Sequence, residues 1–325
     1  MTQISNTDKL MNKDYVFVIA EIGKNFIQSE DERSVEEYLQ NAKDLVNKAV
    51  EAGADAVKFQ THEVEDEQLD INIVSPHFQG SDRYSWVTRN TNATPLDTFW
   101  KPLKKYCDEK GIIFFSTPMS RKAAQKLNEV NVPFWKVGSG DVQDYVTLDY
   151  MISTGKPIII SNGMVGLKEL DEVINYITLK GSRLSVLYCI SQYPAPSEYF
   201  NLSTIEYLKE KYPNVTVGFS DHSIGYDISL ASIKLGASII EKHFSISRDL
   251  WGADHKVSMT PDEMKEMVDA IRAGEYEKAD PTPCYGKKDK ELEGADNMFR
   301  PYFNKSLMVW LSPPISASDN GWSLR

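Results

Sequence analysis

Eight short apolar runs, each ending abruptly in polar residues, are the feature that most limits how this chain can fold. Longer segments separate the runs, and their apolar residues recur at helical spacing, as they do over 34–52 and 121–130. Such alternation of strands and helices is typical of a parallel β-sheet, and closing eight units into a ring brings the strand ends to one rim. The pattern predicts an α/β fold, a (β/α)8 TIM barrel with a short C-terminal extension. The runs end at Ala20-Glu21, Lys58-Phe59-Gln60, Phe115-Ser116-Thr117, Trp135-Lys136-Val137-Gly138-Ser139, Ile160-Ser161-Asn162, Leu187-Tyr188-Cys189, Phe219-Ser220-Asp221-His222 and Ile240-Glu241-Lys242-His243.

The chain length fits one barrel with extensions at both ends. A barrel of this type takes about 250 residues, and the chain has 325. We expect an N-terminal extension over 1–14, the barrel over 15–280, and a linker followed by a tail over 281–325. Thr260 and Glu263 form a capping-box pattern that predicts the last helix of the barrel, ending at Ala273. The tail is rich in Ser and Pro, and we expect it to be disordered.

Composition and charge exclude several classes of function. The net charge is −11, so we expect no nucleic-acid partner. No stretch approaches the roughly 18 apolar residues of a membrane span, and the polar start has no signal-peptide core. We therefore expect no membrane partner and a cytoplasmic location. The cysteines Cys107, Cys189 and Cys284 are too few and too scattered for a disulfide framework or a thiolate metal site, so we expect buried thiols.

The segment 61–94, after the second predicted strand, is unusually long and carries no clear period. Loops of this length in a compact domain are usually lids or binding segments. Tyr84, Trp86, Arg89 and Asn90 are therefore candidates to close over a substrate. A packed surface loop is the alternative, and the sequence leaves both open.

Two histidines follow consecutive predicted strands. His222 comes after the seventh run and His243 at the end of the eighth, and each has a neighbouring acid, Asp221 or Glu241. Neighbouring strands lie about 4.8 Å apart, so two imidazoles at equivalent heights could share one ion. The pattern favours a divalent metal such as manganese over two separate loop-capping histidines. The spacing does not choose among Mn, Co, Fe and Zn.

Two lysines, Lys58 and Lys136, end the second and fourth runs in apolar surroundings. A buried ammonium group is costly unless an anion pairs with it, as a phosphate or carboxylate would. Nearby hydroxyl groups and glycines would let an anion come close to the backbone, so we interpret the rim as an anion site rather than a set of solvated lysines. Glu21 and Asp141 are candidate acid or base groups, unless they bind loop amides instead. The surrounding residues are Thr117, Ser139, Ser161, Ser220, Gly138, Gly140 and Gly163.

Eight segments, in order along the chain, resemble the sialic acid synthase family. The likeness spans roughly residues 15–275. A single tetrapeptide is weak evidence, but eight in order at the ends of successive predicted strands are a specific signal. The segments are Ala20-Glu21-Ile22-Gly23, Val57-Lys58-Phe59-Gln60-Thr61, Phe115-Ser116-Thr117-Pro118, Lys136-Val137-Gly138-Ser139-Gly140-Asp141, Ser161-Asn162-Gly163-Met164, Tyr193-Pro194, Gly218-Phe219-Ser220-Asp221-His222-Ser223 and Glu241-Lys242-His243-Phe244.

The resemblance implies a transferase that condenses phosphoenolpyruvate with an N-acylated mannosamine-type sugar, giving a nine-carbon 2-keto sugar acid and phosphate. It also implies a homodimer and a divalent metal, Mn²⁺ with Mg²⁺ or Co²⁺ as alternatives. By resemblance, Glu21 is the catalytic carboxylate, and His222 and His243 hold the metal. Phosphoenolpyruvate would be bound by Lys58, Thr117, Lys136, Ser139, Ser161, Ser191 and Ser220, and the sugar by Gln60, Asp141, Tyr193 and Asp254.

The sequence departs from the family pattern in several places. Gly23-Lys24-Asn25-Phe26 stands where the family often has Asn-His, and Asn162 replaces a usual small hydroxyl residue, so we expect substrate preference to differ. Asp141 occupies a position where the family more usually has Glu, and Ser191 one where it commonly has Asn. Family members generally continue into an antifreeze-like domain that contributes an arginine to a partner's sugar pocket. Residues 300–309 resemble its beginning but 310–325 do not continue it, so we expect the chain to lack most of that domain.

Two other functions compete with the synthase. One is a Schiff-base aldolase with Lys136 or Lys58 as the amine nucleophile, which leaves the paired histidines unexplained. The other is a catalytically impaired barrel that binds the ligands as a binding or regulatory module. Borohydride trapping and phosphate release distinguish the three.

Overall fold

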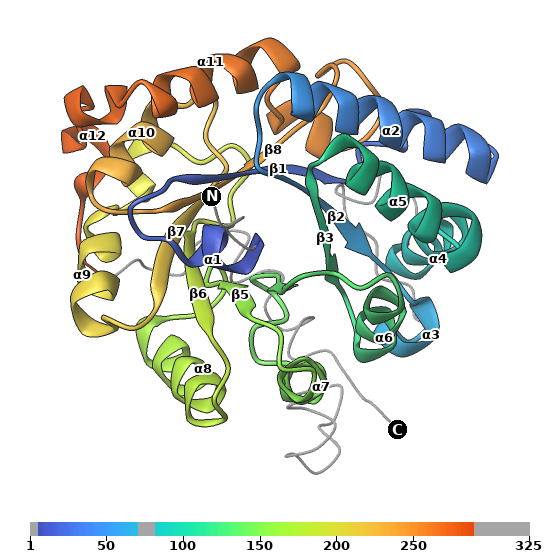
Figure 1. Ribbon diagram of the computed structural model, residues 1–325, viewed down its shortest axis with the longest axis horizontal. Helices are drawn as coiled ribbons and strands as arrows, with labels where there is room; N and C mark the ends of the chain where they lie inside the picture. Colours follow the sequence, from blue (N-terminus) through green and yellow to red (C-terminus); the bar gives the residue numbers. More distant parts are fainter. Residues whose placement is uncertain (1–5, 71–81, 289–325) are drawn as a thin grey trace.

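Eight parallel strands form a nearly closed barrel in the computed structural model, which describes residues 6–70 and 82–288 (Figure 1). Hydrogen-bonded neighbours follow the order β3-β2-β1-β8-β7-β6-β5-β4. β3 and β4, at the two ends of this order, contact each other. The ring is therefore complete except that these two strands share no ladder of backbone hydrogen bonds. The predicted (β/α)8 barrel is confirmed. The strands are β1 (Phe17–Gly23), β2 (Ala56–Thr61), β3 (Ile113–Pro118), β4 (Trp135–Val137), β5 (Ile158–Ser161), β6 (Leu184–Cys189), β7 (Thr216–Asp221) and β8 (Ile239–His243).

The strands are buried on both faces, which is why they read as continuous apolar runs in the sequence. Inside the ring, Phe134 packs edge-on against Phe17 and Phe115, with centroid distances of 6.4 and 4.8 Å. The alternate residues of each strand point outward, toward the helices. The core therefore fixes the strand ends, and with them the rim that carries the polar residues.

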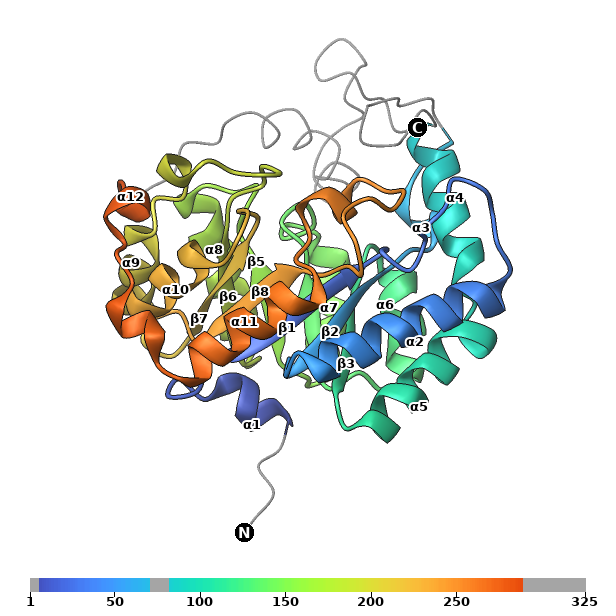
Figure 2. The same cartoon turned by 90° about the horizontal axis from the view of Figure 1, so that it is seen from above.

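Helices connect the strands and cover the outside of the barrel (Figures 1 and 2). The helices expected over 34–52, 121–130 and from Thr260 to Ala273 are found within one residue of their expected ends. The capping box is confirmed, because the Thr260 N–H donates to Glu263 at 2.8 Å. The connecting helices are α2 (Val35–Glu51), α5 (Lys101–Lys110), α6 (Arg121–Glu129), α7 (Tyr145–Ser153), α8 (Leu167–Leu179), α9 (Ser203–Lys211), α10 (Asp227–Lys234) and α11 (Pro261–Arg272), with a π-helical turn, η2 (Leu96–Trp100), leading into α5.

The expectation that 61–94 lacks regular structure is wrong for its described part. It contains α3 (Val64–Glu67) and α4 (Arg83–Ala93), while 71–81 lie outside the described residues. Trp86 and Asn90 are buried, and Arg89 donates to the Ser29 carbonyl at 2.8 Å. The physical reason is packing, since Trp86 and Val87 form a small apolar cluster against Trp251. The segment is a packed helix beside the rim rather than an open loop.

Short elements flank the barrel. α1 (Asn6–Met11) lies next to one end of the ring, where Met11 accepts hydrogen bonds from Ser185 and Thr216 (Figure 2). After α11 come η5 (Glu275–Lys278) and α12 (Thr282–Tyr285), while η3 (Ser197–Tyr199) follows β6 and η4 (Asp254–Val257) follows β8. The expected disordered tail falls on 289–325, outside the described residues.

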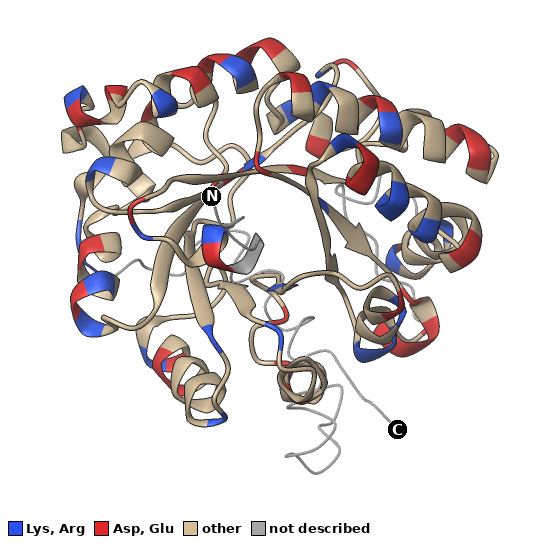
Figure 3. Ribbon diagram, viewed as in Figure 1, with Lys and Arg blue, Asp and Glu red and all other residues tan. Residues whose placement is uncertain are grey.

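Two expectations from composition concern cysteines and membranes. The three cysteines are buried free thiols, as predicted. Within residues 6–70 and 82–288, no helix has the length and apolar character needed to cross a bilayer. Figure 3 shows Lys and Arg interspersed with Asp and Glu along the outer helices rather than gathered by sign.

Candidate active site

The polar rim predicted from the eight runs forms at the carboxyl ends of the strands. Strand register places Glu21 of β1 beside Lys58 of β2 on one side and His243 of β8 on the other. Ser220 of β7 lies beside Glu241 of β8. Because side chains alternate along a strand, Glu241 and His243 point to the same face of β8.

Four charged side chains form the centre of the rim. Lys58 Nζ lies 2.8 Å from Glu21 Oε2 and 3.6 Å from Glu241 Oε1, and Lys136 Nζ lies 3.8 Å from Glu241 Oε1. Each side chain is at most 7% exposed. We call Glu21, Lys58, Lys136 and Glu241 the charge cluster.

Strand geometry settles which acids accompany the buried cations. Lys58 and Lys136 have carboxylate partners within the protein, Glu21 and Glu241, so the predicted anion site already contains two anions of its own. Asp221 does not accompany His222, because it pairs with Lys242 at 2.8 Å on the opposite face of the strands. The expected pairing of Asp221 with His222 is therefore wrong, because neighbours in sequence point to opposite faces of a strand. Glu241 was missed as a site residue, although its position two residues before His243 was a usable signal.

Burial sets the protonation of the two carboxylates differently. Burial raises the pKa of Glu21 to about 7, Lys58 opposes that rise and Glu241 adds to it. Burial also acts to raise the pKa of Glu241, but Lys136 and Lys58 outweigh it and the pKa is lowered. Glu241 is therefore ionised at neutral pH, while Glu21 can gain or lose a proton there.

The lysines are also shifted in opposite directions. Burial lowers the pKa of Lys136, with Glu241 opposing. Burial acts on Lys58 in the same sense, but Glu21 and Glu241 outweigh it, so its pKa is raised. Lys58 is the more firmly charged of the two.

Hydroxyl groups surround the charge cluster as the sequence suggested. Lys58 Nζ donates to Thr117 at 3.2 Å and Lys136 Nζ to Ser161 at 2.7 Å. Ser220 donates to Glu241 at 3.1 Å. These contacts bring together the polar residues of β2, β3, β4, β5, β7 and β8.

Gly163 brings a second pair of hydroxyls together. Its N–H donates to Ser139 at 2.9 Å. A Cβ at this position would overlap Ser191 Oγ and lie 2.5 Å from Ser139 Oγ. Only glycine therefore lets the backbone approach Ser139 and Ser191 this closely.

The four residues expected to contact a sugar lie around the same rim. Gln60 donates to Glu21 Oε1 at 3.0 Å. Asp141 is buried in the turn after β4, where its N–H donates to the Gly138 carbonyl at 3.1 Å. Tyr193 is half-exposed, and its ring centroid lies 4.0 Å from that of His222. Asp254 begins η4 and raises the pKa of His243 against the effect of burial.

The two histidines face each other, with ring centroids 5.5 Å apart. Nδ1 of His222 lies 2.7 Å from the Ile190 carbonyl, which fixes the proton on Nδ1 and leaves Nε2 able to ligate an ion. Nδ1 of His243 is buried without a hydrogen-bond partner among the described residues, and burial lowers the pKa of His243 to about 4. Burial acts to lower the pKa of His222 as well, but Cys189 and the Ile190 carbonyl outweigh it and the pKa is raised. His243 is therefore the more firmly neutral of the two imidazoles, and both are placed to ligate an ion. Nowhere in 6–70 or 82–288 do three or more His, Cys, Asp or Glu residues form a complete metal cage, so water or substrate would supply the other ligands.

Comparison with known proteins agrees with this geometry. A model of the NeuB family matches residues 45–281, which include every strand except β1. The chain belongs to the NeuB family. The eight-segment resemblance to sialic acid synthases is thereby confirmed.

Relatives within the NeuB family are named as biosynthetic proteins. Human N-acetylneuraminate-9-phosphate synthase is 32% identical over 82% of this chain and 74% of its own length. Spore coat polysaccharide biosynthesis protein SpsE of Bacillus subtilis is 35% identical over 85% of this chain and 71% of its own. The crystal structure of N-acetylneuraminic acid (sialic acid) synthetase from Leptospira borgpetersenii, in complex with citrate, superposes with a TM-score of 0.70 at 28% identity, covering 91% of this chain and 93% of that one. This NeuB-family chain is therefore an enzyme of the synthase kind.

Proposed function

We propose that this protein condenses phosphoenolpyruvate with an N-acylated mannosamine-type sugar, giving a nine-carbon 2-keto sugar acid and phosphate. The observation that carries the proposal is the charge cluster beside the His222–His243 pair. It offers two ammonium groups for a small polyanion and, next to them, a carboxylate whose pKa lies near neutrality.

The proposed roles divide the rim into two parts. Lys58 and Lys136 bind the phosphate and carboxylate of phosphoenolpyruvate, helped by nearby hydroxyls that stabilise the charge. Gln60, Asp141, Tyr193 and Asp254 bind the sugar. The hydroxyl residues are Thr117, Ser139, Ser161, Ser191 and Ser220.

The chemistry follows from these roles. The enol carbon of phosphoenolpyruvate forms a bond to the aldehyde carbon of the open-chain sugar, and the aldehyde oxygen takes up a proton from solvent to become a hydroxyl. The ester carbon, left cationic, is attacked by water. Glu21 takes one proton from that water, and collapse of the tetrahedral intermediate breaks the carbon–oxygen bond to phosphate, which leaves with the second proton, and forms the ketone. When Lys58 pairs with the bound anion, its electrostatic attraction to Glu21 weakens. The pKa of Glu21 then rises, so Glu21 is a stronger base.

His222 and His243 are the proposed ligands of a divalent ion, Mn²⁺ with Mg²⁺ or Co²⁺ as alternatives. When bound, such an ion supplies Lewis acidity at the aldehyde oxygen. Asp254, which acts electrostatically on His243, would keep the sugar against this side of the rim.

The proposal predicts metal-dependent phosphate release. With Mn²⁺ and phosphoenolpyruvate, the protein should release phosphate on addition of N-acetylmannosamine or a 2,4-diacetamido sugar, a panel that covers sialic, legionaminic and pseudaminic acid precursors. A chelator should abolish release, and added Mn²⁺ should restore it. Binding without release across the whole panel would instead identify a non-catalytic barrel.

The activity should rise with pH. Only the ionised form of Glu21 accepts a proton, and its pKa is about 7. Below pH 7 we therefore expect kcat/KM to increase about tenfold per pH unit, and above pH 7 to level off. The profile should be recorded at saturating Mn²⁺, since protonation of His222 would also release metal. A profile that instead falls through pH 7 would contradict the role of Glu21.

One observation favours a second candidate. Burial lowers the pKa of Lys136, which would make its amine more nucleophilic, as a Schiff-base aldolase requires. Borohydride treatment with pyruvate would then leave a covalent adduct on Lys136, and a chelator would not affect turnover. We favour the synthase because Glu241 opposes the shift and the paired histidines have no role in an aldolase.

A further inference from the structure

A buried ion pair lies directly behind the two histidines of the rim, on the outer face of the barrel. Asp221 of β7 and Lys242 of β8 are partners in the strand register, and Lys242 Nζ lies 2.8 Å from Asp221 Oδ2. Their side chains are 0% and 1% exposed. In the sequence, each is the residue immediately before a candidate metal ligand, His222 or His243. The pair therefore joins two strands at the point where they present the histidines.

The ion pair belongs to a small network in which both charged groups are fully paired. Lys242 Nζ also donates to the Ser223 carbonyl at 2.8 Å and to Ser223 Oγ at 3.1 Å, which accounts for the three hydrogens of the ammonium group. Asp221 Oδ1 accepts from the Ser223 N–H at 2.7 Å, and Oδ2 accepts from the Ser229 hydroxyl of α10 at 2.6 Å. The network therefore acts within the protein rather than on a ligand. We call Asp221, Ser223, Ser229 and Lys242 the outer clamp.

The outer clamp holds the backbone on both sides of His222. Asp221 precedes His222 and Ser223 follows it, and the two charged groups of the clamp bind the N–H and the carbonyl of Ser223. A carboxylate that accepts from the N–H two residues later closes a turn around the residue between them. The carbonyl of His222 accepts from the Ala195 N–H at 3.2 Å, and its Nδ1 lies 2.7 Å from the Ile190 carbonyl. The backbone position and the ring direction of His222 are thus set by separate contacts.

Stability alone does not account for a buried ion pair at this position. Two apolar side chains of similar volume often stabilise a protein as well as a buried ion pair or better, because no charge has to be desolvated. They could hold β7 against β8, but they could not bind the N–H and the carbonyl of Ser223. Metal ligands, in contrast, must lie within about 0.2 Å of their working distance. What the charges add is a defined position for the turn that carries His222.

We propose that the outer clamp orients His222 for binding of a divalent cation, so that Asp221 and Lys242 are positioning residues rather than ligands. His243 needs less support, because it lies within β8 and its carbonyl accepts from the Met259 N–H at 2.8 Å. His222 lies one residue beyond the end of β7, and the clamp holds it where the strand has ended. The inference rests on the proposed function, since it assumes that His222 and His243 hold the ion.

The test uses the double variant Asp221→Asn/Lys242→Met, which removes both charges together, keeps most of the side-chain volume and leaves no single charge buried. Mn²⁺ binding is measured by calorimetry on the full chain without substrates. We expect the Kd for Mn²⁺ to rise about 10–100-fold, the usual effect of losing a group that orients a metal ligand. A Kd within twofold of the wild type would overturn the proposal. If circular dichroism shows that the double variant does not fold, Ser229→Ala decides instead: the loss of one hydrogen bond to Asp221 should raise the Kd about fivefold, and an unchanged Kd would overturn the proposal.

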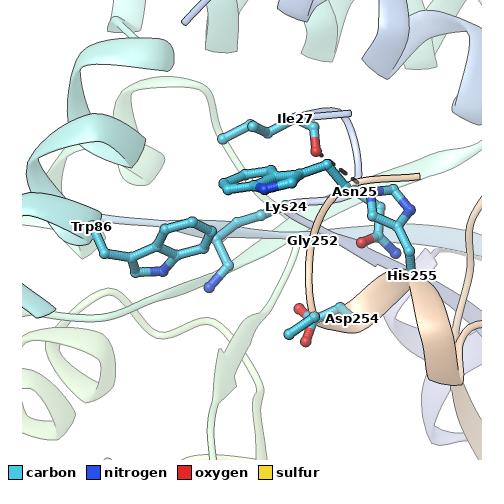
Figure 4. A pocket seen from close by; sticks show the side chains of 9 residues that line it. Lys24, Asn25, Ile27, Trp86, Gly252, Asp254 and His255 are labelled. Atoms are coloured by element: carbon cyan, nitrogen blue, oxygen red, sulfur yellow. Dashed lines mark hydrogen bonds between the residues drawn. The ribbon is translucent and has the colours of Figure 1, made fainter. Parts of the chain in front are cut away.

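A second measurement needs no metal. The chain has five histidines, so ¹⁵N labelling of histidine gives few signals, and the variant His222→Gln identifies the one from His222. The Nδ1–H of His222 should exchange slowly in the wild type, because it faces the Ile190 carbonyl, and should exchange faster or give two tautomers in the double variant. Unchanged exchange would overturn the proposal even if the Kd rises. His255 is the internal control, since its Nε2 lies 3.4 Å from the Ile27 carbonyl (Figure 4) and its Nδ1 lies 2.6 Å from Ser245 Oγ, and its signals should not change.

Arg272→Met controls for a general loss of stability. Arg272 lies 2.8 Å from Asp55, which is 4% exposed and precedes β2 at the opposite end of the barrel. This variant should lower the free energy of unfolding and leave the Kd for Mn²⁺ unchanged, whereas an equal rise in Kd would overturn the proposal. A wild-type chain that binds no Mn²⁺ would reject the proposed metal ligands, and exchange at His222 would then decide whether the clamp orients it. The expected pattern in both measurements without phosphate release would reject the synthase and keep the clamp.

Discussion

Glutamine in place of Glu21 is expected to lower kcat for phosphate release by about 10²–10⁴-fold, the usual contribution of a positioned acid or base. Glu21 is the carboxylate of the charge cluster whose pKa lies near neutrality, about 7, because it is buried. Glutamine keeps the shape and can still accept the hydrogen bond that Gln60 donates to Oε1. The loss should therefore fall on kcat, with little change in the KM for phosphoenolpyruvate. The measurement is steady-state phosphate release at saturating Mn²⁺.

A matched control separates chemistry from a general effect of losing a carboxylate. Glu65 is 80% exposed on α3 and pairs with Lys122 on the surface. Glu65→Gln should keep wild-type kcat. If Glu21→Gln retained kcat within threefold, another group would have to accept the proton of the attacking water.

Methionine in place of Lys58 is expected to destabilise the fold by about 3–5 kcal/mol, the typical cost of removing one partner from a buried ion pair. Lys58 lies between Glu21 at 2.8 Å and Glu241 at 3.6 Å, so its loss leaves two buried carboxylates near each other. The free energy of unfolding would be measured in urea. Activity should be lost as well, because Lys58 is a proposed ligand of phosphoenolpyruvate.

The double variant Lys58→Met/Glu21→Gln tests the cause of that destabilisation. It removes one charge of each sign, so it should be more stable than Lys58→Met alone. The control Lys105→Met removes an exposed lysine whose nearest carboxylate lies 3.8 Å away, and it should change stability by less than about 0.5 kcal/mol. A double variant no more stable than Lys58→Met would mean that charge pairing is not what Lys58 provides.

Local patterns predicted most of the fold. Continuous apolar runs located all eight strands, and the capping box of Thr260 and Glu263 located the start of α11 within one residue. These signals depend on residues a few positions apart. α7 gave no comparable signal, because Tyr145–Ser153 is apolar on most of its faces and shows no clear polar side.

The packing of the segment after β2 could not be predicted in the same way. Trp86 belongs to a cluster with Trp251, which lies 165 positions later in the chain. The apolar residues of α4 show only weak helical spacing, because its buried residues contact distant segments of the chain rather than one continuous face of the core.

The sequence by itself determined that the polar residues would meet at one end of a closed sheet. Continuous apolar runs specify the strands, and in a parallel barrel the carboxyl ends of all strands lie on the same rim. The tertiary structure alone decided which charges pair. Lys58 and Lys136 pair with Glu21 and Glu241, whereas Asp221 pairs with Lys242 on the opposite face of the strands. Pairing depends on which face a side chain takes and how strands align, and in a low-dielectric interior differences of an ångström or two decide which carboxylate an ammonium holds.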